Sequence, residues 1–417
     1  MARYQITGPS VLSGEVVVGG SKNAVLPCLA ATLLTDEDVH LENVPAIRDV
    51  ESMCEILRTF GCETARTGNA VTVTGARHVH PVDDALTSRL RASILILGPL
   101  LGRFGRVEIA HPGGDIIGKR PIDMHFEGLR GLGATIEQTN SHYVVSAEKG
   151  LTGGEIFLEE ASVTATENVM MAAVLASGRT VIRNAASELH VVDLAHFLSA
   201  MGAKIEGAGT NRITIDGVTS LHGATHRIRP DEIEAATLMI AAAVTGGSIV
   251  LKNTDPENMG IILTKLRHAG VSFSTEQDHI SVQAPHRLMS TNIHTNVWPA
   301  FPTDLVSPFT ILMTQATGMS LIHDWMYEGR FFYTDKLVLM GANIVMADPH
   351  RILVHGPSKL TAKNLESPDL RAGMTMVIAA LIAEGTTTIE HVEHIERGYE
   401  RIDERLKSLG ARIERVE

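Results

Sequence analysis

The chain has 417 residues, 44% of them hydrophobic and 20% charged, so it contains enough apolar material for two or three folded domains and is not disordered. Its formal net charge of −12 excludes a general binder of nucleic acid or of anionic membrane surfaces. The N-terminus lacks the apolar segment of a secretion signal, and the longest apolar runs, such as 235–244, reach about half the length that spans a bilayer. The three cysteines, Cys28, Cys54 and Cys62, have no metal-ligand spacing, and their odd number is typical of a reducing compartment, so we expect a cytoplasmic protein.

Six similar units of about 70 residues follow one another along the chain. In each unit an amphipathic segment ends in a phrase such as RGLGA at 130–134 or KSLGA at 407–411. Glycine after the last helical turn is typical of a left-handed cap, and the alternating residues that follow predict strands. The six glycines are Gly61, Gly133, Gly202, Gly270, Gly341 and Gly410.

Each unit opens with a segment rich in Ala and Leu that is apolar on nearly every side, which predicts a buried helix. A β-rich phrase such as RTVIRNA at 179–185 comes next, so each unit is predicted to run helix, strand, helix, strand, strand. The period exceeds the roughly 20–50 residues of common solenoids, so we expect two similar globular domains of three units each. The buried helices are expected within 23–34, 91–102, 167–178, 234–247, 304–318 and 371–385.

A loop is predicted at 111–121, which reads HPGGDIIGKRP. Glycine relaxes the backbone and proline interrupts hydrogen-bonded structure, so this segment has mobility available. It carries one acid, Asp115, and ends in the cations Lys119 and Arg120. Taken alone, the segment fits a solvated surface turn as well as it fits a catalytic loop.

Polar residues recur at two places in the repeats, at the start of the buried helix and near the start of the second helix. A helix N-terminus binds anions, whereas Lys or Arg there opposes the helix dipole, so an anionic ligand is expected to offset the conflict. Singly, the cations also fit solvated side chains and the acids fit helix caps. Because cations occur in both halves, we expect the two sets to face one cleft and grip a small polyanion. The residues are Lys22, Asn23, Arg91, Arg120, Asp304, Arg330, Asp369, Arg371 and Arg397.

Seven phrases stand out along the chain: GGSKNAVLP at 19–27, LRAS at 90–93, PGG…GKRPIDMH at 112–125, AFPTD at 300–304, EGR at 328–330, PDLRAG at 368–373 and RGYERIDERL at 397–406. In combination they closely resemble those of the UDP-N-acetylglucosamine 1-carboxyvinyltransferase family. The resemblance runs from residue 1 to 417 and implies the inside-out α/β barrel of enolpyruvyl transferases such as EPSP synthase, with two domains of three repeats. One domain would be 21–229, with loop 111–121, and the other 1–20 plus 230–417.

The family's activity is the transfer of an enolpyruvyl group from phosphoenolpyruvate to the 3-hydroxyl of UDP-N-acetylglucosamine, the first committed step of peptidoglycan synthesis. The resemblance implies addition followed by elimination: C3 is protonated, the sugar hydroxyl attacks C2, and the adduct expels phosphate. General acid and base groups supply the proton movements. No metal, organic cofactor, nucleic acid, membrane or obligate protein partner is implied.

Residue roles follow from the same resemblance. The phosphate of phosphoenolpyruvate would bind Lys22, Arg120 and Arg397, and its carboxylate would bind Arg330 and Arg371. Asp304 would be the base beside the 3-hydroxyl. The sugar nucleotide would lie along Asn23, Arg91, Arg120, Pro121, Asp123, Ser162, Val163, Asp304 and Tyr327, and Arg91 would also assist with phosphoenolpyruvate.

The sequence departs from the family at two positions. Asp115 stands where the commoner loop has cysteine; both are proton donors when protonated, so the resemblance implies that the loop is a lid and Asp115 its catalytic acid. An ordinary aspartate with a pKa of about 3.9 donates poorly at neutral pH, so lid closure would have to raise its pKa. Glu160 stands where some relatives have a lysine near the diphosphate, which puts that contact in doubt.

Two alternatives remain beside this interpretation. A shikimate 3-phosphate enzyme, or one for another nucleotide, would share the fold, but a shikimate-type chain would lack the long loop between Gly102 and Pro121. A non-catalytic nucleotide-sugar sensor would be favoured by loss of the cationic pairs or of the AFPTD acid, and this chain retains them.

Overall fold

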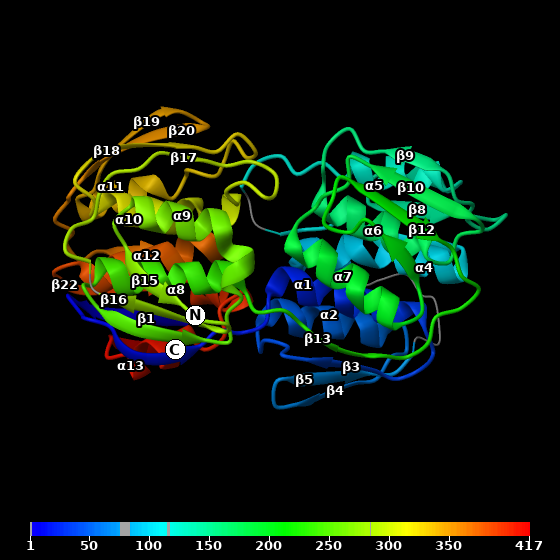
Figure 1. Cartoon of the computed structure of the whole chain (residues 1–417), viewed down its shortest axis with the longest axis horizontal. Coiled ribbons are helices and arrows are strands. Elements are labelled where there is room, and N and C mark those ends of the chain that lie inside the picture. The colour runs from blue at the N-terminus through cyan, green and yellow to red at the C-terminus, as the bar shows by residue number, and fades with distance from the viewer. Residues whose placement is uncertain (1, 76–83, 115–116, 284) are drawn as a thin grey trace. The chain divides into compact units, whose positions relative to one another are not determined.

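The computed structural model describes residues 2–75, 84–114, 117–283 and 285–417. These residues form two compact units (Figure 1). We call residues 20–114 and 120–229 the N-repeat unit, and residues 2–19, 117–119 and 230–417 the C-repeat unit. No helix of the described residues combines the length and the apolar character needed to cross a bilayer.

The N-repeat unit contains three repeats, and each contributes one sheet. The sheets have the strand orders β13-β3-β5-β4, β6-β8-β7 and β11-β12-β10-β9. The helices are α1 (Lys22–Ala31), η1 (Thr32–Leu34), α2 (Arg48–Thr59), α3 (Asp84–Arg89), η2 (Arg91–Ile96), α4 (Leu97–Phe104), α5 (Asp123–Gly131), α6 (Val163–Ala173) and α7 (Leu189–Ala200). The strands are β3 (Val39–Glu42), β4 (Thr64–Thr67), β5 (Ala70–Val73), β6 (Arg106–Ala110), β7 (Thr135–Gln138), β8 (His142–Ser146), β9 (Glu155–Phe157), β10 (Arg179–Arg183), β11 (Lys204–Glu206), β12 (Arg212–Asp216) and β13 (Thr225–Arg227).

The C-repeat unit is built in the same way, with sheets β15-β16-β14-β2, β17-β18-β20-β19 and β21-β22-β1-β23. Its helices are α8 (Glu232–Val244), η3 (Pro256–Met259), α9 (Gly260–His268), η4 (Thr303–Leu305), α10 (Val306–Thr314), α11 (Thr334–Met340), α12 (Leu370–Ile382), η5 (Val392–Arg397) and α13 (Ile402–Ser408). Its strands are β1 (Arg3–Gly8), β2 (Ser13–Val17), β14 (Ser248–Lys252), β15 (Ser272–Thr275), β16 (His279–Gln283), β17 (Ile293–His294), β18 (Gly318–His323), β19 (Asn343–Asp348), β20 (Arg351–Gly356), β21 (Asn364–Glu366), β22 (Gly385–Glu390) and β23 (Arg412–Val416). The predicted order of helix, strand, helix, strand, strand is confirmed, for example by α6, β10, α7, β11 and β12.

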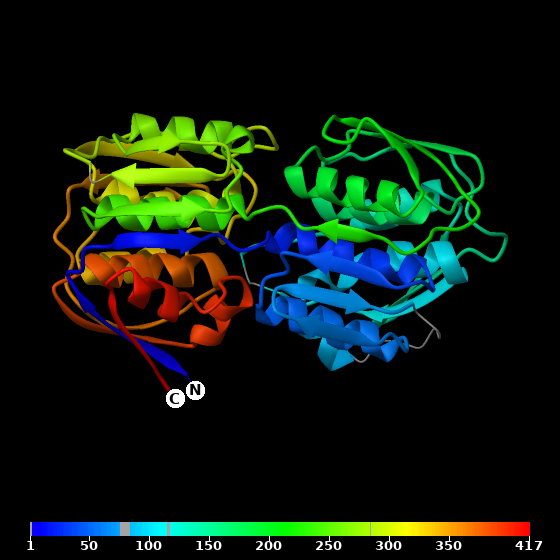
Figure 2. The ribbon, with the colours of Figure 1, turned by 60° about the horizontal axis from the view of Figure 1, so that its bottom comes forward.

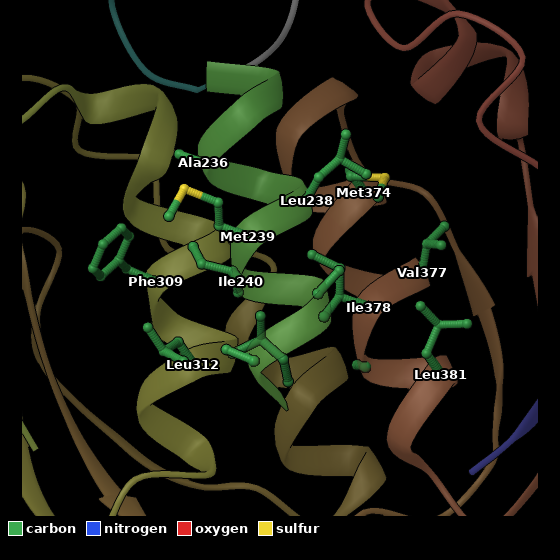
Figure 3. Packing of buried hydrophobic residues seen from close by; sticks show 14 of the residues in the cluster. Ala236, Leu238, Met239, Ile240, Phe309, Leu312, Met374, Val377, Ile378 and Leu381 are labelled. Atoms are coloured by element: carbon green, nitrogen blue, oxygen red, sulfur yellow. The ribbon is translucent and has the colours of Figure 1, made fainter. Parts of the chain in front are cut away.

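The buried helices were predicted from segments that are apolar on every side, and this prediction is confirmed. In the C-repeat unit, α8, α10 and α12 pack together, and side chains such as Met239 and Ile378 fill the space between them (Figure 3). In the N-repeat unit, α4 packs on α6 and α1 packs on α7. Every residue of α12 except Ile382 is buried, so an outward-facing polar stripe has no place on such a helix.

The glycines that mark the repeats have the backbone conformation expected of left-handed caps. All six have a positive φ, from 82° at Gly270 to 111° at Gly341. A side chain with a Cβ rarely adopts this conformation, which is why each outer helix can turn sharply into its hairpin.

Two short strands are exchanged between repeats that lie far apart in the sequence. β2 precedes α1 in the chain but pairs in parallel with β14, and β13 precedes α8 but pairs in parallel with β3. β1 fills the place between β22 and β23, so the two ends of the chain lie side by side (Figures 1 and 2). The sequence reading did not include these opening strands.

An asparagine follows the first strand after the buried helix in three repeats and is held at positive φ: Asn43, Asn184 and Asn253. Each side-chain amide donates a hydrogen bond to a carbonyl just past the neighbouring parallel strand, at 2.7–2.9 Å. In the fifth repeat, the corresponding position after β18 is Asp324, which belongs to the candidate site described next.

Candidate active site

The C-repeat unit brings two predicted arginines, Arg330 and Arg371, to the carboxylate of a third predicted residue, Asp304. Asp304 lies in η4, the turn that leads into α10, and its side chain is 29% exposed. Arg330 Nη2 donates to Asp304 Oδ1 at 2.6 Å, and Arg371 Nη2 and Nε donate to Asp304 Oδ2 at 3.3 and 3.4 Å. Asp304 therefore sits between two guanidinium groups and remains accessible on one side.

Both arginines are buried, with Arg330 5% exposed and Arg371 3% exposed. Burial lowers the pKa of Arg371, but Tyr399 and Asp304 raise its pKa overall, so the guanidinium is charged. The guanidinium of Arg371 also lies 5.4 Å above the Tyr399 ring, and its Nη1 is buried without a hydrogen-bond partner among the described residues. This cation has been desolvated, which strengthens its attraction for an anion.

Asp324 lies beside Arg330, and sequence reasoning missed it. It is fully buried, accepts hydrogen bonds from the backbone N–H groups of Met326 and Tyr327, and lies 3.9 Å from Arg330 Nε. The Thr303 hydroxyl also donates to Asp324. Tyr327, a predicted nucleotide contact, is half-buried with its ring 5.9 Å from the Arg330 guanidinium carbon. Asp324 thus fixes the turn that carries Arg330.

From the sequence, both Asp304 and Asp369 could be helix caps, and the structure shows that they differ in this role. Asp369 is the cap of α12, because its Oδ1 accepts from the backbone N–H groups of Arg371 and Ala372, both at 2.8 Å. Asp304 is not an N-cap residue, because Pro302 is the N-cap of η4 and Leu305 that of α10. Arg397 is half-buried and ends η5, five residues before α13 begins, so it lies farther from its outer helix than expected.

Part of the predicted loop is described and groups with the C-repeat unit. Ile117 O accepts from Gly329 N at 3.0 Å, and Lys119 N donates to Glu328 Oε1 at 3.0 Å. The hydrogen bond from Lys119 lowers the pKa of Glu328. This segment therefore lies beside the turn that carries Tyr327 and Arg330. Asp115 itself is outside the described residues, and its role stays a prediction.

In the N-repeat unit, Lys22 is the first residue of α1 and is buried against Asp49 of α2, with Nζ 2.7 Å from Asp49 Oδ2. Asp49 is 3% exposed. A cation at a helix N-terminus is unfavourable, and the Asp49 carboxylate offsets this cost. The sequence alone predicts an anionic ligand in this role. Asn23 is half-buried beside Lys22.

Arg91 and Arg120 also lie together in this unit. Arg91 Nη2 donates to the carbonyl of Arg120 and is 3.5 Å from the carbonyl of Pro121. The chain between them packs tightly, since a Cβ on Gly113 would lie 1.6 Å from the Ser88 carbonyl oxygen, and one on Gly114 would lie 2.7 Å from Arg91 Cβ. Glycine is required at both positions for the loop to approach Arg91.

The remaining predicted residues lie at helix N-termini of the same unit. Ser162 caps α6, with its hydroxyl accepting from Ala165 N at 3.4 Å, and Val163 begins that helix. Asp123 begins α5 and is exposed, as is Pro121. Glu160 is also exposed. Free backbone N–H groups at such ends suit a diphosphate.

Predicted residues occur in both units, and the sequence missed the acidic neighbours Asp49, Asp324 and Glu328. Glu328 is the first residue of the phrase EGR, one of the seven that carry the family resemblance, so the sequence did point to this segment. Asp324 occupies the place of the repeated asparagine, a difference that aligning the repeats reveals.

Comparison with known proteins finds relatives that match along the whole chain. Residues 6–406 match the family of EPSP synthase (3-phosphoshikimate 1-carboxyvinyltransferase). A UDP-N-acetylglucosamine 1-carboxyvinyltransferase of Borreliella burgdorferi is 45% identical over 100% of this chain and 99% of its own length, and that of Aeromonas hydrophila is 43% identical over 100% of both. Among solved structures, the enolpyruvyl transferase NikO from Streptomyces tendae aligns over 100% of this chain and 99% of its own, with a TM-score of 0.91 and 24% identity. An EPSP synthase from Acinetobacter baumannii aligns over 100% of both chains, with a TM-score of 0.80 and 20% identity; these two likenesses establish the inside-out α/β barrel fold.

Proposed function

The chain belongs to the EPSP synthase family, and we propose that it is a UDP-N-acetylglucosamine 1-carboxyvinyltransferase. It transfers the enolpyruvyl group of phosphoenolpyruvate to the 3-hydroxyl of the sugar nucleotide and releases phosphate, the first committed step of peptidoglycan synthesis. The acceptor follows from relatives of that name that are 43–45% identical over the whole chain. Cytoplasmic placement is supported by three free, buried cysteines.

The observation that carries the chemistry is the Asp304 carboxylate between the buried guanidinium groups of Arg330 and Arg371. Paired arginines suit a carboxylate, and we assign them to the carboxylate of phosphoenolpyruvate. When that anion arrives, it competes with Asp304 for the same N–H donors. Asp304 is then released to accept the proton of the 3-hydroxyl.

The other groups are assigned to the phosphate and to the nucleotide. Lys22, Arg120 and Arg397 bind the phosphate of phosphoenolpyruvate, and Arg91 supports Arg120 through the carbonyl contact described above. Asn23 holds the amino sugar, and Tyr327 contacts the sugar nucleotide. The diphosphate lies along Pro121, Asp123 and the start of α6 at Ser162 and Val163.

Proton transfer completes the assignment. Asp115 donates a proton to C3 while Asp304 removes the hydroxyl proton, and the hydroxyl oxygen bonds to C2. In the second step the ionised Asp115 takes a proton back from C3 while the C2–O bond to phosphate breaks, and the proton held by Asp304 goes to the departing phosphate, which regenerates the enol ether. Each proton transfer by a positioned group contributes roughly 100- to 10,000-fold in rate.

The test is incubation of the pure protein with phosphoenolpyruvate and UDP-N-acetylglucosamine, followed by assay of phosphate and of the product's mass. We expect phosphate release that depends on both substrates and a nucleotide heavier by one enolpyruvyl group. Shikimate 3-phosphate serves as the competing acceptor. Turnover with shikimate 3-phosphate and none with the sugar nucleotide would overturn the proposed acceptor.

A further inference from the structure

A buried polar cluster in the N-repeat unit has no part in the proposed reaction. It joins Cys28 of α1, Asp193 of α7 and His226 of β13. Their potential ligand atoms all lie within 4.8 Å of one another, and within the described part of the chain no other group of three His, Cys, Asp or Glu residues meets this geometry. The three residues lie far apart in the sequence, so their spacing gave no sign of a metal site.

The three side chains are held in place by their surroundings. Asp193 Oδ1 lies 3.1 Å from His226 Nε2, and Asp193 Oδ2 accepts from the backbone N–H of Arg229 at 3.3 Å. The His226 ring packs against the Phe197 ring, with centroids 5.4 Å apart. Cys28 is fully buried, and the side chains of Asp193 and His226 are 10% and 13% exposed. A site built in this way requires little reorganisation to receive an ion.

A second observation points to a cation. Glu167 of α6 is 1% exposed, and its Oε1 makes no hydrogen bond within the described residues. Glu167 lies near Cys28, and burial raises the pKa of the Glu167 carboxyl group. A buried carboxylate oxygen without a donor is costly, and a positive ion beside it removes that cost.

We propose that this cluster binds one divalent cation of the zinc class through Cys28 Sγ, Asp193 Oδ1 and His226 Nε2. A water molecule supplies the fourth ligand. Sulfur, imidazole nitrogen and carboxylate oxygen in one site select a borderline-soft ion and exclude Ca²⁺ and Mg²⁺, which prefer oxygen alone.

Binding follows a simple charge and proton balance. The Cys28 thiol loses its proton to solvent, and the proton of His226 moves from Nε2 to Nδ1, which leaves the Nε2 lone pair for the metal. One thiolate and the Asp193 carboxylate then neutralise the two positive charges. The ion would join α1, α7 and β13 within the unit whose α1 begins with Lys22, so it stabilises this unit by mass action.

The experiment is a titration of metal-free, full-length protein with Co²⁺, followed by competition with Zn²⁺. We expect one equivalent of Co²⁺, a near-ultraviolet thiolate-to-cobalt absorption band, and displacement of Co²⁺ by Zn²⁺ with a rise in Tm. Cys28→Ser is expected to abolish the band, and His226→Gln is expected to weaken Zn²⁺ binding at least about tenfold. Cys54→Ser is the matched control, because Cys54 is a buried thiol of the same unit outside the cluster, and it is expected to keep the band.

The proposal is overturned if no saturable band forms, if the band persists in Cys28→Ser, or if it is lost in Cys54→Ser. Far-ultraviolet circular dichroism checks that each variant is folded. Should Cys28→Ser fail to fold, His226→Gln decides the matter, and unchanged Zn²⁺ affinity in that variant refutes the site.

Discussion

Arg330 donates a hydrogen bond to Asp304 at 2.6 Å, so a proposed anion-binding group holds the proposed base. The same guanidinium cannot serve both partners fully, because its donors point in fixed directions. Binding of the substrate carboxylate therefore weakens the hold on Asp304 at the moment when the base is needed. Asp304 therefore becomes free to act as a base only when the substrate carboxylate has bound to Arg330.

Replacing Asp304 by Asn is the first test, since Asn keeps the size of the side chain but cannot accept a proton as a base. We expect kcat to fall by about 100-fold or more, with a smaller change in the affinity for UDP-N-acetylglucosamine. Steady-state kinetics and calorimetry measure the two quantities. Asp369→Asn is the matched control: Asn is also a good helix cap, so its kcat should fall far less. Equal losses in both variants would remove Asp304 from the role of base.

Variants of the Lys22–Asp49 pair allow the effect of Lys22 on stability to be measured apart from its effect on catalysis. Lys22→Ala removes the cation that lies 2.7 Å from a carboxylate that is only 3% exposed, so we expect a loss of about 3–5 kcal/mol in the free energy of unfolding as well as weaker use of phosphoenolpyruvate. Adding Asp49→Asn to Lys22→Ala removes the buried charge and should restore part of the stability without restoring activity. Urea denaturation and the KM for phosphoenolpyruvate report the two effects. A double variant as unstable as the single one would contradict the pairing.

Local physics explains what the sequence predicted well. The buried helices follow from segments without a polar face, and the caps at Gly133 and Gly341 follow from glycine's freedom at positive φ. The places of Lys22, Arg91 and Arg371 at helix starts followed from aligning the repeats.

Pairing between distant segments explains what was missed. β2 and β13 are strands of five and three residues whose partners lie in distant repeats, and so short a segment has no period of its own. Asp49 and Asp324 belong to the candidate site because they lie beside Lys22 and Arg330. These contacts arise only when the chain folds, so the sequence does not show them. A repeat alignment shows the position of Asp324 but not that it lies beside Arg330.

The close approach of the loop to Arg91 leads to a third prediction. In Gly113→Ala the new Cβ would lie 1.6 Å from the Ser88 carbonyl oxygen, so the loop must shift and carry Arg120 with it. A displacement of about 1 Å near reacting groups can cost about 100-fold in rate, and we expect a loss of that order in kcat/KM with little change in Tm. Gly260→Ala is the control, because a Cβ there meets nothing within 4 Å, and its activity should stay normal. Normal kinetics in Gly113→Ala would show that the loop's fit against Ser88 is not needed.

His125 gives the folded protein a pH dependence. Burial, with a smaller effect of Arg91, lowers the pKa of His125 from 6.5 to about 3. Asn168 is oriented by Gly98 N and Ile94 O, so its Nδ2 donates to His125 Nδ1 at 2.7 Å, and the neutral ring donates from Nε2 to Thr164. Protonation at Nδ1 would break this arrangement.

The sign of the effect follows from linkage. Between pH 6.5 and about 3 the unfolded chain binds a proton at His125 that the folded chain does not, so stability falls as the pH falls through this window. The contribution is about 1.4 kcal/mol per pH unit, or about 2 kcal/mol between pH 6.5 and about pH 5. Urea denaturation of the wild type and of His125→Gln at both pH values measures it: the stability advantage of the wild type should shrink by about that amount. An advantage that is constant with pH would refute a buried neutral histidine.

The last prediction concerns Asp115 and rests on the sequence. Fosfomycin is an electrophilic epoxide, and the resemblance implies that it inactivates cysteine-loop members of the family by alkylating the loop thiol. A carboxylate is a much weaker nucleophile than a thiolate, and Cys28, Cys54 and Cys62 are all buried, so we expect the wild type to resist the drug while remaining active.

Two substitutions at Asp115 then separate its roles as the group in the thiol's position and as the acid. Asp115→Cys should keep some activity, because a thiol can donate a proton, and should become sensitive to fosfomycin in a time-dependent way, with a covalent mass increase on the loop peptide. Asp115→Asn keeps the shape without the acidic proton and should lose about 100-fold or more in kcat. Residual activity after timed exposure to the drug and peptide mass spectrometry provide the readouts. Rapid inactivation of the wild type would show that Asp115 does not occupy the thiol's position, and an Asn variant at full speed would show that C3 receives its proton from another group.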